Sequence, residues 1–182
     1  MKIPYLKLWI QVVRGLIALA LGMAPMVNAA EPLAQKTVLI HLKTGLDLDD
    51  AQLCVAYNQI WAAAETGQRV QVLVDASAVK TYKKGWLGGN ELEDYEIPED
   101  LRRILSKEFH LPLEKIPRTY GEYLRMLHAE GVEFFINSEM LVTYGIEKEY
   151  GKVENLAVDF FKPVGIQEAL RLVTNADIYL VY

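Results

Sequence analysis

The sequence predicts an α/β protein in which strands alternate with helices. From Lys36 onward, apolar runs of strand length alternate with segments whose apolar residues recur at helical spacing. A strand at 37–42, a helix at about 51–66 and a strand at 70–74 follow one another. This order makes a β-α-β unit, in which the strands are parallel and the crossover is right-handed almost without exception. We therefore expect a mainly parallel sheet covered by helices.

Cap residues mark the ends of the expected helices. Asp49 and Asp50 precede the helix at 51–66 as N-cap residues, and Gly67 follows it as a C-cap residue. The later elements are a helix at about 99–109, a helix at 119–130, a strand at 132–136, a short helix that ends at Gly145, a strand at 156–160, a helix at about 166–174 and a strand at 178–181. Residues at about 80–119 are the least sheet-like, and we expect an inserted region of loops and short helices there.

The apolar run from Val132 to Ile136 passes directly into the start of a helix. Its β-branched and aromatic residues are typical of a buried strand. Asn137 and Ser138 follow, and both are good N-cap residues. Free backbone N–H groups and the helix dipole point at such a junction, which is where α/β sheets often bind ligands or place reactive groups. The sequence thus predicts that any chemistry is centred near Asn137.

Residues 1–29 have the features of a secretory signal peptide. They contain three basic residues, an apolar run at 15–24 and small residues at 27–29 that suit a cleavage site. The apolar run is far shorter than the ~20 residues that span a bilayer, so an uncleaved anchor is the less favoured alternative. We expect a periplasmic or secreted domain at 30–182, with no stable membrane insertion after the signal is removed.

Charge and cysteine content restrict the partners and the source of stability. The chain has 19 basic and 24 acidic residues, and three of the basic residues but none of the acidic ones lie in the signal peptide. The mature domain therefore has a net charge of −8. A net acidic chain without a basic run argues against nucleic acid or an anionic membrane as a partner. Cys54 is the single cysteine, so no internal disulfide can form and core burial must stabilise the domain.

Several local patterns together resemble a known family. They are Thr44-Gly45 and Asp49-Asp50 after the first strand, the alanine-rich helix that ends at Gly67, the run VQVLVDASAV at 70–79, the approach Gly131-Val132-Glu133-Phe134 and the terminal run Ala176-Asp177-Ile178-Tyr179. With these features, most of residues 36–182 resembles the DsrE/DsrF-like superfamily, which includes sulfur-relay proteins of sulfur oxidation and of tRNA thiolation. The resemblance implies a single-domain, three-layer α/β/α sandwich with a mainly parallel sheet of five to six strands. It also implies assembly into homo- or hetero-oligomers.

The chain departs from this family at the residue that carries the family's chemistry. In active members, a cysteine directly after the central strand receives and passes on a persulfide, and some relatives have a Cys-x-x-Cys pair there. The matching positions in this chain are Asn137 and Met140. An amide has no thiolate to accept sulfur, and a thioether is neither a persulfide carrier nor a redox partner. The family's sulfur transfer is therefore not expected of this chain.

Polar residues at the expected carboxyl ends of the strands are our candidates for ligand binding, namely His41, Thr44, Asp75, Asn137 and Ser138. His41 and Cys54 are the two candidates for catalysis. A histidine beside a carboxylate can serve acid–base chemistry, and Cys54 is the only possible sulfur nucleophile. Because Cys54 lies one helical turn from Tyr57, we expect it to be buried as a small hydrophobic residue.

We expect no metal site and no cofactor. His41, His110 and His128 lie far apart in the sequence, without the paired spacing of a zinc site. Gly85, Gly88 and Gly89 fit neither phosphate-binding spacing, so we predict a mobile loop there.

The sequence favours a non-catalytic binding or assembly module for a sulfur- or redox-pathway partner or a small ligand. Two alternatives stay open. One is a sulfur carrier or thiol-dependent enzyme that uses Cys54. The other is a structural subunit of a homo-oligomer, in which Trp86 and its neighbours pack against another copy.

Overall fold

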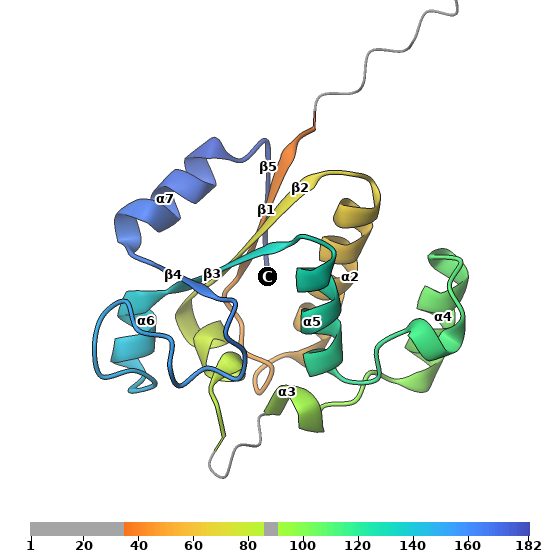
Figure 1. Cartoon of the computed structure of the whole chain (residues 1–182), viewed down its shortest axis with the longest axis horizontal. Helices are drawn as coiled ribbons and strands as arrows, with labels where there is room; N and C mark the ends of the chain where they lie inside the picture. Colours follow the sequence, from red (N-terminus) through yellow and green to blue (C-terminus); the bar gives the residue numbers. More distant parts are fainter. Residues whose placement is uncertain (1–34, 86–90) are drawn as a thin grey trace, which may run out of the picture. The chain divides into compact units, whose positions relative to one another are not determined.

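A computed structural model of the chain describes residues 35–85 and 91–182, and Figure 1 shows their elements. The signal peptide expected at 1–29 lies outside the described residues, as do Trp86, Gly88 and Gly89. The strands in the described part are β1 (Thr37–Leu42), β2 (Arg69–Val74), β3 (Glu133–Asn137), β4 (Lys162–Val164) and β5 (Ile178–Val181). The helices are α2 (Asp50–Glu65), α3 (Glu91–Asp94), α4 (Glu99–Glu108), α5 (Tyr120–Ala129), α6 (Ser138–Thr143) and α7 (Ile166–Asn175), with 3-10 helices η1 (Ala76–Tyr82) and η3 (Leu113–Lys115).

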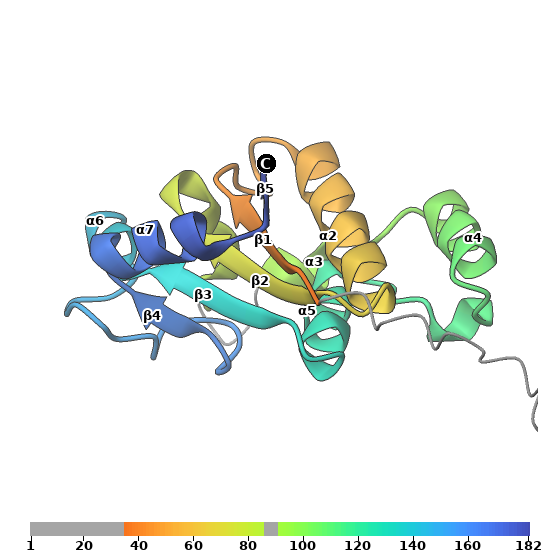
Figure 2. The same ribbon diagram turned by 90° about the horizontal axis from the view of Figure 1, so that it is seen from above.

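The five strands form one parallel sheet in the order β4-β3-β2-β1-β5. The chain moves outward from β1 to β4 and then returns to place β5 on the other side of β1. Because right-handed crossovers in opposite directions lie on opposite faces, α2 and α5 cover one face and α7 covers the other. Figure 1 shows α7 on the left of the strands and α2 and α5 on the right, and Figure 2 shows the same ribbon from above. The predicted three-layer α/β/α fold, with five parallel strands, is confirmed.

Side chains alternate between two cores of unequal size. The face under α2 and α5 contributes Val38, Ile40, Leu42, Val70, Val72, Val74, Phe134 and Ile136, which pack on Leu53, Tyr57, Ile60, Trp61, Tyr123, Leu124 and Leu127 of the helices. The opposite face contributes Leu39, Leu73, Phe135 and Val164, which pack on Leu172 of α7. Because strand side chains alternate with a period of two, every second strand residue belongs to the smaller core. Most of the burial therefore lies on the α2 and α5 side.

The expected helix ends agree closely with the structure. The side chain of Asp49 caps α2, since its Oδ1 accepts from the backbone N–H of Gln52 at 3.0 Å. Gly131 follows α5 with a φ of 90°, a conformation that glycine adopts without a steric cost. This turn directs the chain into β3. The helices predicted at 51–66, 99–109, 119–130 and 166–174 are confirmed to within one or two residues.

Arg102 of α4 anchors the insertion that was predicted at about 80–119. It is buried, and its Nε donates to Pro117 O at 2.9 Å. Its Nη2 donates to Leu113 O at 3.1 Å and to Ile116 O at 3.0 Å, while Nη1 pairs with Glu99 Oε2 at 2.6 Å. One guanidinium thus satisfies three carbonyls of a segment that has little regular structure.

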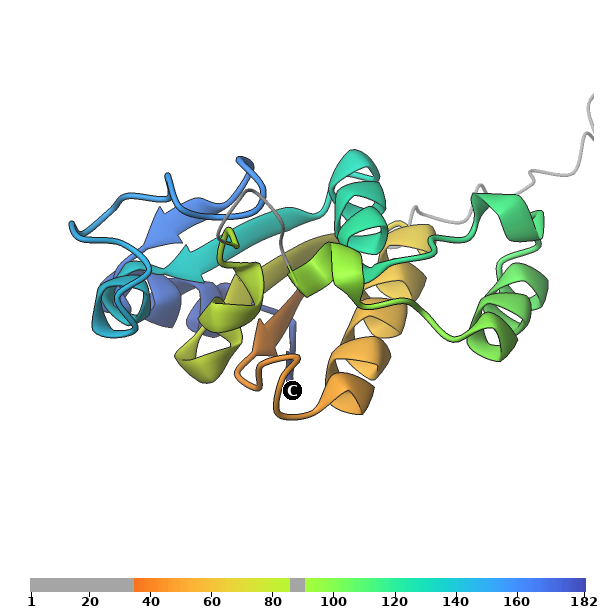
Figure 3. The same cartoon turned by 90° about the horizontal axis from the view of Figure 1, so that it is seen from below.

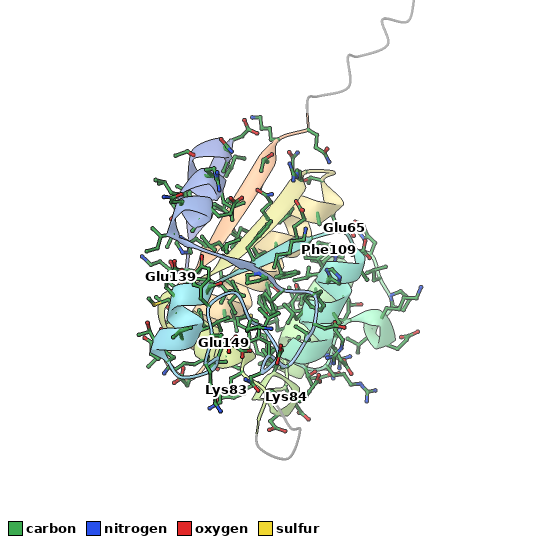
Figure 4. All side chains as sticks on the ribbon, turned by 60° about the vertical axis from the view of Figure 1, so that its left-hand side comes forward. Glu65, Lys83, Lys84, Phe109, Glu139 and Glu149 are labelled. Atoms are coloured by element: carbon green, nitrogen blue, oxygen red, sulfur yellow. The ribbon has the colours of Figure 1, made fainter. Side chains whose placement is uncertain are left out.

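A ring stack joins the insertion to α2. The ring of Phe109, at the end of α4, lies 3.8 Å from that of Trp61, and Trp61 Nε1 donates to Glu65 Oε1 at 3.3 Å. Figure 4 labels Phe109 and Glu65 at this contact, and Figure 3 shows α4 beside α2. The stack buries an aromatic surface that α4 could not cover alone.

The strand expected at 156–160 is wrong. Leu156 makes only an isolated antiparallel bridge with Lys83, and the fourth strand is β4. The ring of Phe160 instead stacks on His128 of α5 at 4.0 Å between centroids. The apolar residues of this run are therefore explained by side-chain packing against α5 and not by backbone pairing in the sheet.

Replacing Arg102 tests the anchoring role. Arg102→Met removes a donor from three carbonyls and leaves the two buried ones, of Ile116 and Pro117, without it, so we expect the free energy of unfolding to fall by about 3 kcal/mol. Urea unfolding followed by circular dichroism measures this change. Arg103→Met is the matched control, because Arg103 is exposed and pairs with Glu99 only at 3.6 Å. Its loss should stay within ~0.5 kcal/mol, and equal losses for the two variants would contradict the anchoring role.

Candidate functional site

Three polar side chains meet at the carboxyl ends of neighbouring strands. His41 lies near the end of β1, Asp75 directly follows β2, and Asn137 ends β3. His41 Nε2 lies 3.2 Å from Asp75 Oδ2, and Asn137 Nδ2 donates to Asp75 Oδ1 at 2.9 Å. All three alternate with residues of the larger core and so belong to the α7 face of the sheet. The structure brings together three of the five residues proposed for ligand binding.

Tyr179 of β5 is a fourth member of this cluster, which the sequence did not reveal. Its hydroxyl oxygen lies 2.8 Å from His41 Nδ1. β5 pairs with β1 so that Tyr179 is opposite Leu39 and Val181 is opposite His41, which puts Tyr179 on the same face as His41. The alternation within β5 was visible in the sequence. Its position next to β1 was not, and that position depends on the strand order. We call His41, Asp75, Asn137 and Tyr179 the strand-end cluster.

The hydrogen-bond donors of the strand-end cluster follow from the charge on Asp75. A hydrogen bond from His41 holds the pKa of Asp75 below its ordinary value of 3.8, against the opposing effect of burial. The ionised carboxylate can only accept, so His41 Nε2 carries the proton and donates to it. In the neutral ring, Nδ1 is then an acceptor and receives the Tyr179 hydroxyl proton. Burial and the nearby charge of Asp75 raise the pKa of Tyr179. This phenol therefore acts as a hydrogen-bond donor and not as a nucleophile.

Asp75 is oriented by its own backbone as well. Its Oδ1 also accepts from the backbone N–H of Ala76 at 2.6 Å. Ala76 has a φ of 47°, a left-handed conformation that is rare for residues other than glycine. Such strain persists only where the surroundings fix the backbone. The start of η1 is thus held in the geometry that aims the carboxylate at His41 and Asn137.

Asn137 is occupied at both ends of its amide. Its Oδ1 accepts from the backbone N–H of Met140 at 3.1 Å and caps α6, as the sequence predicted. Its Nδ2 is bonded to Asp75, and the residue is only 6% exposed. An asparagine with both groups engaged and little exposed surface has little capacity left for a ligand. Asn137 therefore links the end of β3 both to Asp75 and to the start of α6.

Thr44 and Ser138 do not join the strand-end cluster. The backbone N–H of Thr44 donates to Tyr182 O at 3.3 Å, and its side chain is half-buried. Ser138 is buried, and its Oγ has no hydrogen-bond partner among the described residues. Neither side chain makes a described hydrogen bond to His41 or Asp75.

Cys54 lies on the opposite side of the sheet. It is half-buried on α2, which covers the face away from His41, and Asn58 Nδ2 lies 3.8 Å from its Sγ. Burial raises the pKa of the Cys54 thiol, while hydrogen bonds from Tyr120 and Asn58 oppose the rise only in part. A thiol with a raised pKa is a poor sulfur nucleophile. Cys54 and His41, the two candidates for catalysis, cannot act together because the sheet separates them.

A surface cavity lies away from the strand-end cluster. It has a volume of about 640 Å³ and lies between α5 and residues 153–160. Its lining combines apolar side chains such as Val158 and Phe160 with Lys84, Arg125 and His128. Figure 4 labels Lys84 near its edge. Arg125 is already paired with Glu93. The cavity is thus an open surface hollow of mixed charge.

A second cavity of about 440 Å³ lies where α7 begins. Gly165 caps α7 without a side chain, and the backbone N–H of Ile166 donates to Glu139 Oε1 of α6 at 3.2 Å. Figure 4 shows Glu139 between α6 and α7. A Cβ on Gly165 would meet the hydroxyl of Tyr150, so the exposed Tyr150 side chain would have to move to admit a larger residue. Glu139 therefore supplies from a neighbouring helix the cap that α7 lacks.

The structure offers no metal site in the part of the chain that it describes, since no group of three histidine, cysteine, aspartate or glutamate side chains is arranged to hold an ion there. Within the same residues, none of the helices has the length and apolarity needed to cross a membrane.

Comparisons with known proteins support the fold. No protein-family model and no curated protein matches the chain. Among solved structures, it is similar to the crystal structure of the YchN protein from E. coli, over 81% of this chain and 99% of that chain. The TM-score is 0.52 and the identity is 14%, so the likeness shows the fold alone. The likeness agrees with the α/β fold that the sequence predicts.

Removing the amide of Asn137 tests how much its two side-chain hydrogen bonds stabilise the fold. Asn137→Ala deletes the cap of α6 and the bond to Asp75, so we expect the free energy of unfolding to fall by about 2 kcal/mol. Asn175→Ala, at the exposed end of α7, is the control and should change it by less than ~0.5 kcal/mol. Urea unfolding measures both. If Asn137→Ala lowers the free energy of unfolding no more than the control does, these hydrogen bonds do not stabilise the fold.

The loss of stability at low pH tests the role of the Asp75 carboxylate. Because folding lowers the pKa of Asp75, its contribution is complete above the ordinary value of 3.8 and is lost as the pH falls through the folded-state pKa. Wild type should therefore lose more stability than Asp75→Asn when the pH is lowered from about 5 to below 3. Urea midpoints along this range measure the difference. Asp100→Asn, an exposed site on α4, should keep the wild-type slope. Parallel profiles for wild type and Asp75→Asn would contradict the role of this carboxylate.

Proposed function

We propose that this protein is an exported, non-catalytic binding or assembly module with a DsrE-like fold, which recognises a sulfur- or redox-pathway partner or a small ligand and does not carry sulfur. The observation that supports this most is the hydrogen bonding of the Asn137 amide. Its amide stands at the junction of β3 and α6 and is bonded to both Asp75 and Met140. No sulfur acceptor stands at that junction.

The environment of Cys54 also supports the proposal. Its thiol is half-buried against Asn58 and Tyr120, and burial raises its pKa. A carrier thiol needs the opposite, namely an accessible thiolate in an electropositive setting. Cys54 also lies on the face of the sheet away from the helix start of α6, so that helix dipole cannot lower its pKa.

In this proposal, the exposed members of the strand-end cluster make the contact. Tyr179 is 41% exposed and Asp75 is partly exposed, whereas His41 and Asn137 are 7% and 6% exposed. The two buried residues would hold the other two in place. Thr44 and Ser138 stay proposed contacts at the same sheet edge. A site of this composition suits a ligand that offers hydrogen-bond donors, because the carboxylate accepts them and the phenol oxygen, whose proton is given to His41, accepts them as well.

A sulfane-sulfur donor separates binding from sulfur transfer. We expect native wild-type protein to gain no persulfide on Cys54 at a donor concentration that fully modifies a small thiol, because its thiolate fraction is low. Asn137→Cys in a Cys54→Ala background is the positive control. It puts a thiol at the start of α6, where the helix end favours the thiolate, and should gain sulfur. Mass spectrometry of the intact protein and of its peptides reads both.

Sulfur transfer to Cys54 would support the alternative function. A stoichiometric persulfide on Cys54 of the wild type, absent from Cys54→Ala, would replace the binding proposal with a sulfur carrier that uses Cys54. Circular dichroism of each variant confirms that the comparison is between folded proteins.

A further inference from the structure

The outer edge of β5 is an unprotected sheet edge. β5 pairs with β1 on one side, and the described residues contribute no strand on the other side. The backbone N–H of Tyr182 donates to His41 O at 2.9 Å, and Tyr182 O accepts from Lys43 N at 2.6 Å, so the polar groups of Tyr182 face β1. Backbone groups alternate in direction along a strand. The N–H and C=O groups of Tyr179 and Val181 therefore point outward, away from the sheet.

The two edges of the sheet differ in how they are protected. β4, at the other edge, has three residues and includes Lys162, which pairs with Glu133, and Pro163, which has no N–H. A charge, a proline and short length are the usual means of blocking edge pairing. β5, with four residues, has neither a charged residue nor a proline. Its side chains are apolar yet 39% exposed at Ile178, 41% at Tyr179 and 50% at Val181.

We propose that β5 pairs antiparallel with β5 of a second copy of this chain, so that a two-fold axis at Leu180 joins two sheets into one. The outward groups decide the register. In an antiparallel pair, two opposed residues exchange both backbone hydrogen bonds. Tyr179 of each copy therefore lies opposite Val181 of the other copy, and the two Leu180 residues lie opposite each other. Opposed residues in this register lie on the same face, so the α7 faces of both copies are continuous.

Charge favours a second copy as the occupant. The chain is net acidic, with a formal charge of −5, so most contacts between copies are repulsive. The run from Ile178 to Tyr182 has no charged side chain. Lys43 lies beside the end of this run, and Asp177 lies at its start. The two-fold axis brings the end of one copy's strand beside the start of the other's, so Lys43 and Asp177 of different copies approach each other at roughly two strand spacings.

The pairing would also complete the strand-end cluster. Tyr179 is its most exposed member and faces the α7 side with His41. Opposite it, Val181 of the second copy would cover part of its ring, since opposed side chains on one face touch. Each copy would thus close one side of the cluster in the other. This inference does not depend on the proposed ligand, because the mass of the assembly is measured without one.

The mass of the full-length protein tests the proposal. Sedimentation and native mass spectrometry should give twice the chain mass for wild type at micromolar concentration. Val181→Lys adds the edge charge that β5 lacks and puts two ammonium groups on diagonal positions, so its mass should fall to that of one chain. Ile178→Lys should do the same. Ile104→Lys, at an exposed apolar position on α4, is the control and should keep the wild-type mass.

Three results would overturn the proposal. They are a wild-type monomer, an assembly that survives both β5 variants, and hydrogen-exchange protection of the Tyr179 and Val181 amides in a protein of single-chain mass. The last result would mean that another part of the same chain, such as residues 1–34, covers the edge.

A cysteine pair tests the register. In a Cys54→Ala background, Leu180→Cys puts two thiols opposite each other at a pair whose Cα atoms are about 4.5 Å apart, close enough for a disulfide. Mild oxidation should therefore give a covalent dimer. Val181→Cys opposes Tyr179 and not itself, so it should cross-link far less. Equal cross-linking of the two variants, or cross-linking of Val181→Cys alone, would exclude this axis.

Discussion

The carboxylate of Asp75 is the acceptor on which the carboxyl end of the sheet depends. It receives hydrogen bonds from Ala76, Asn137 and His41, which belong to three different segments. A partly buried carboxylate is stable only when such donors replace the water it has lost. One side chain thus fixes the ends of β1, β2 and β3 at the point where the ladder of the sheet stops.

Patterns of burial were sufficient to predict most of the fold. The continuous apolar runs at β1, β2 and β3 reflect strands that are covered on both faces, and the caps at Asp49 and Asn137 act through bonds within a few residues. Such local causes can be recognised in a sequence. The failure at 156–160 has the opposite cause. Phe160 is apolar because His128, far away in the sequence, stacks on it, and a single sequence cannot distinguish that packing from strand pairing.

The candidate site was predictable to the same extent. His41, Asp75 and Asn137 could be grouped because parallel strands bring their carboxyl ends to one edge. Tyr179 could not, since its contact with His41 requires that the last strand return beside the first, and that order depends on the crossover of α7. Thr44 and Ser138 follow strand ends too, yet neither side chain makes a described hydrogen bond to the cluster. The position of a residue after a strand predicts its neighbourhood, whereas its contacts depend on the side-chain direction.

The thin layer formed by α7 has a consequence for how the molecule moves. Leu172 is the one fully buried side chain described for this helix, while Ile166 and Leu170 face solvent. Opening a segment costs in proportion to the apolar contacts that it loses, so α7 has a low barrier to local unfolding. Only two residues separate it from β5, and the two must therefore loosen together. The sheet and the α2 and α5 layer would then remain folded while the amides of the α7 layer exchange with solvent. The molecule would thus have two cooperative units on one sheet, with different free energies of local unfolding.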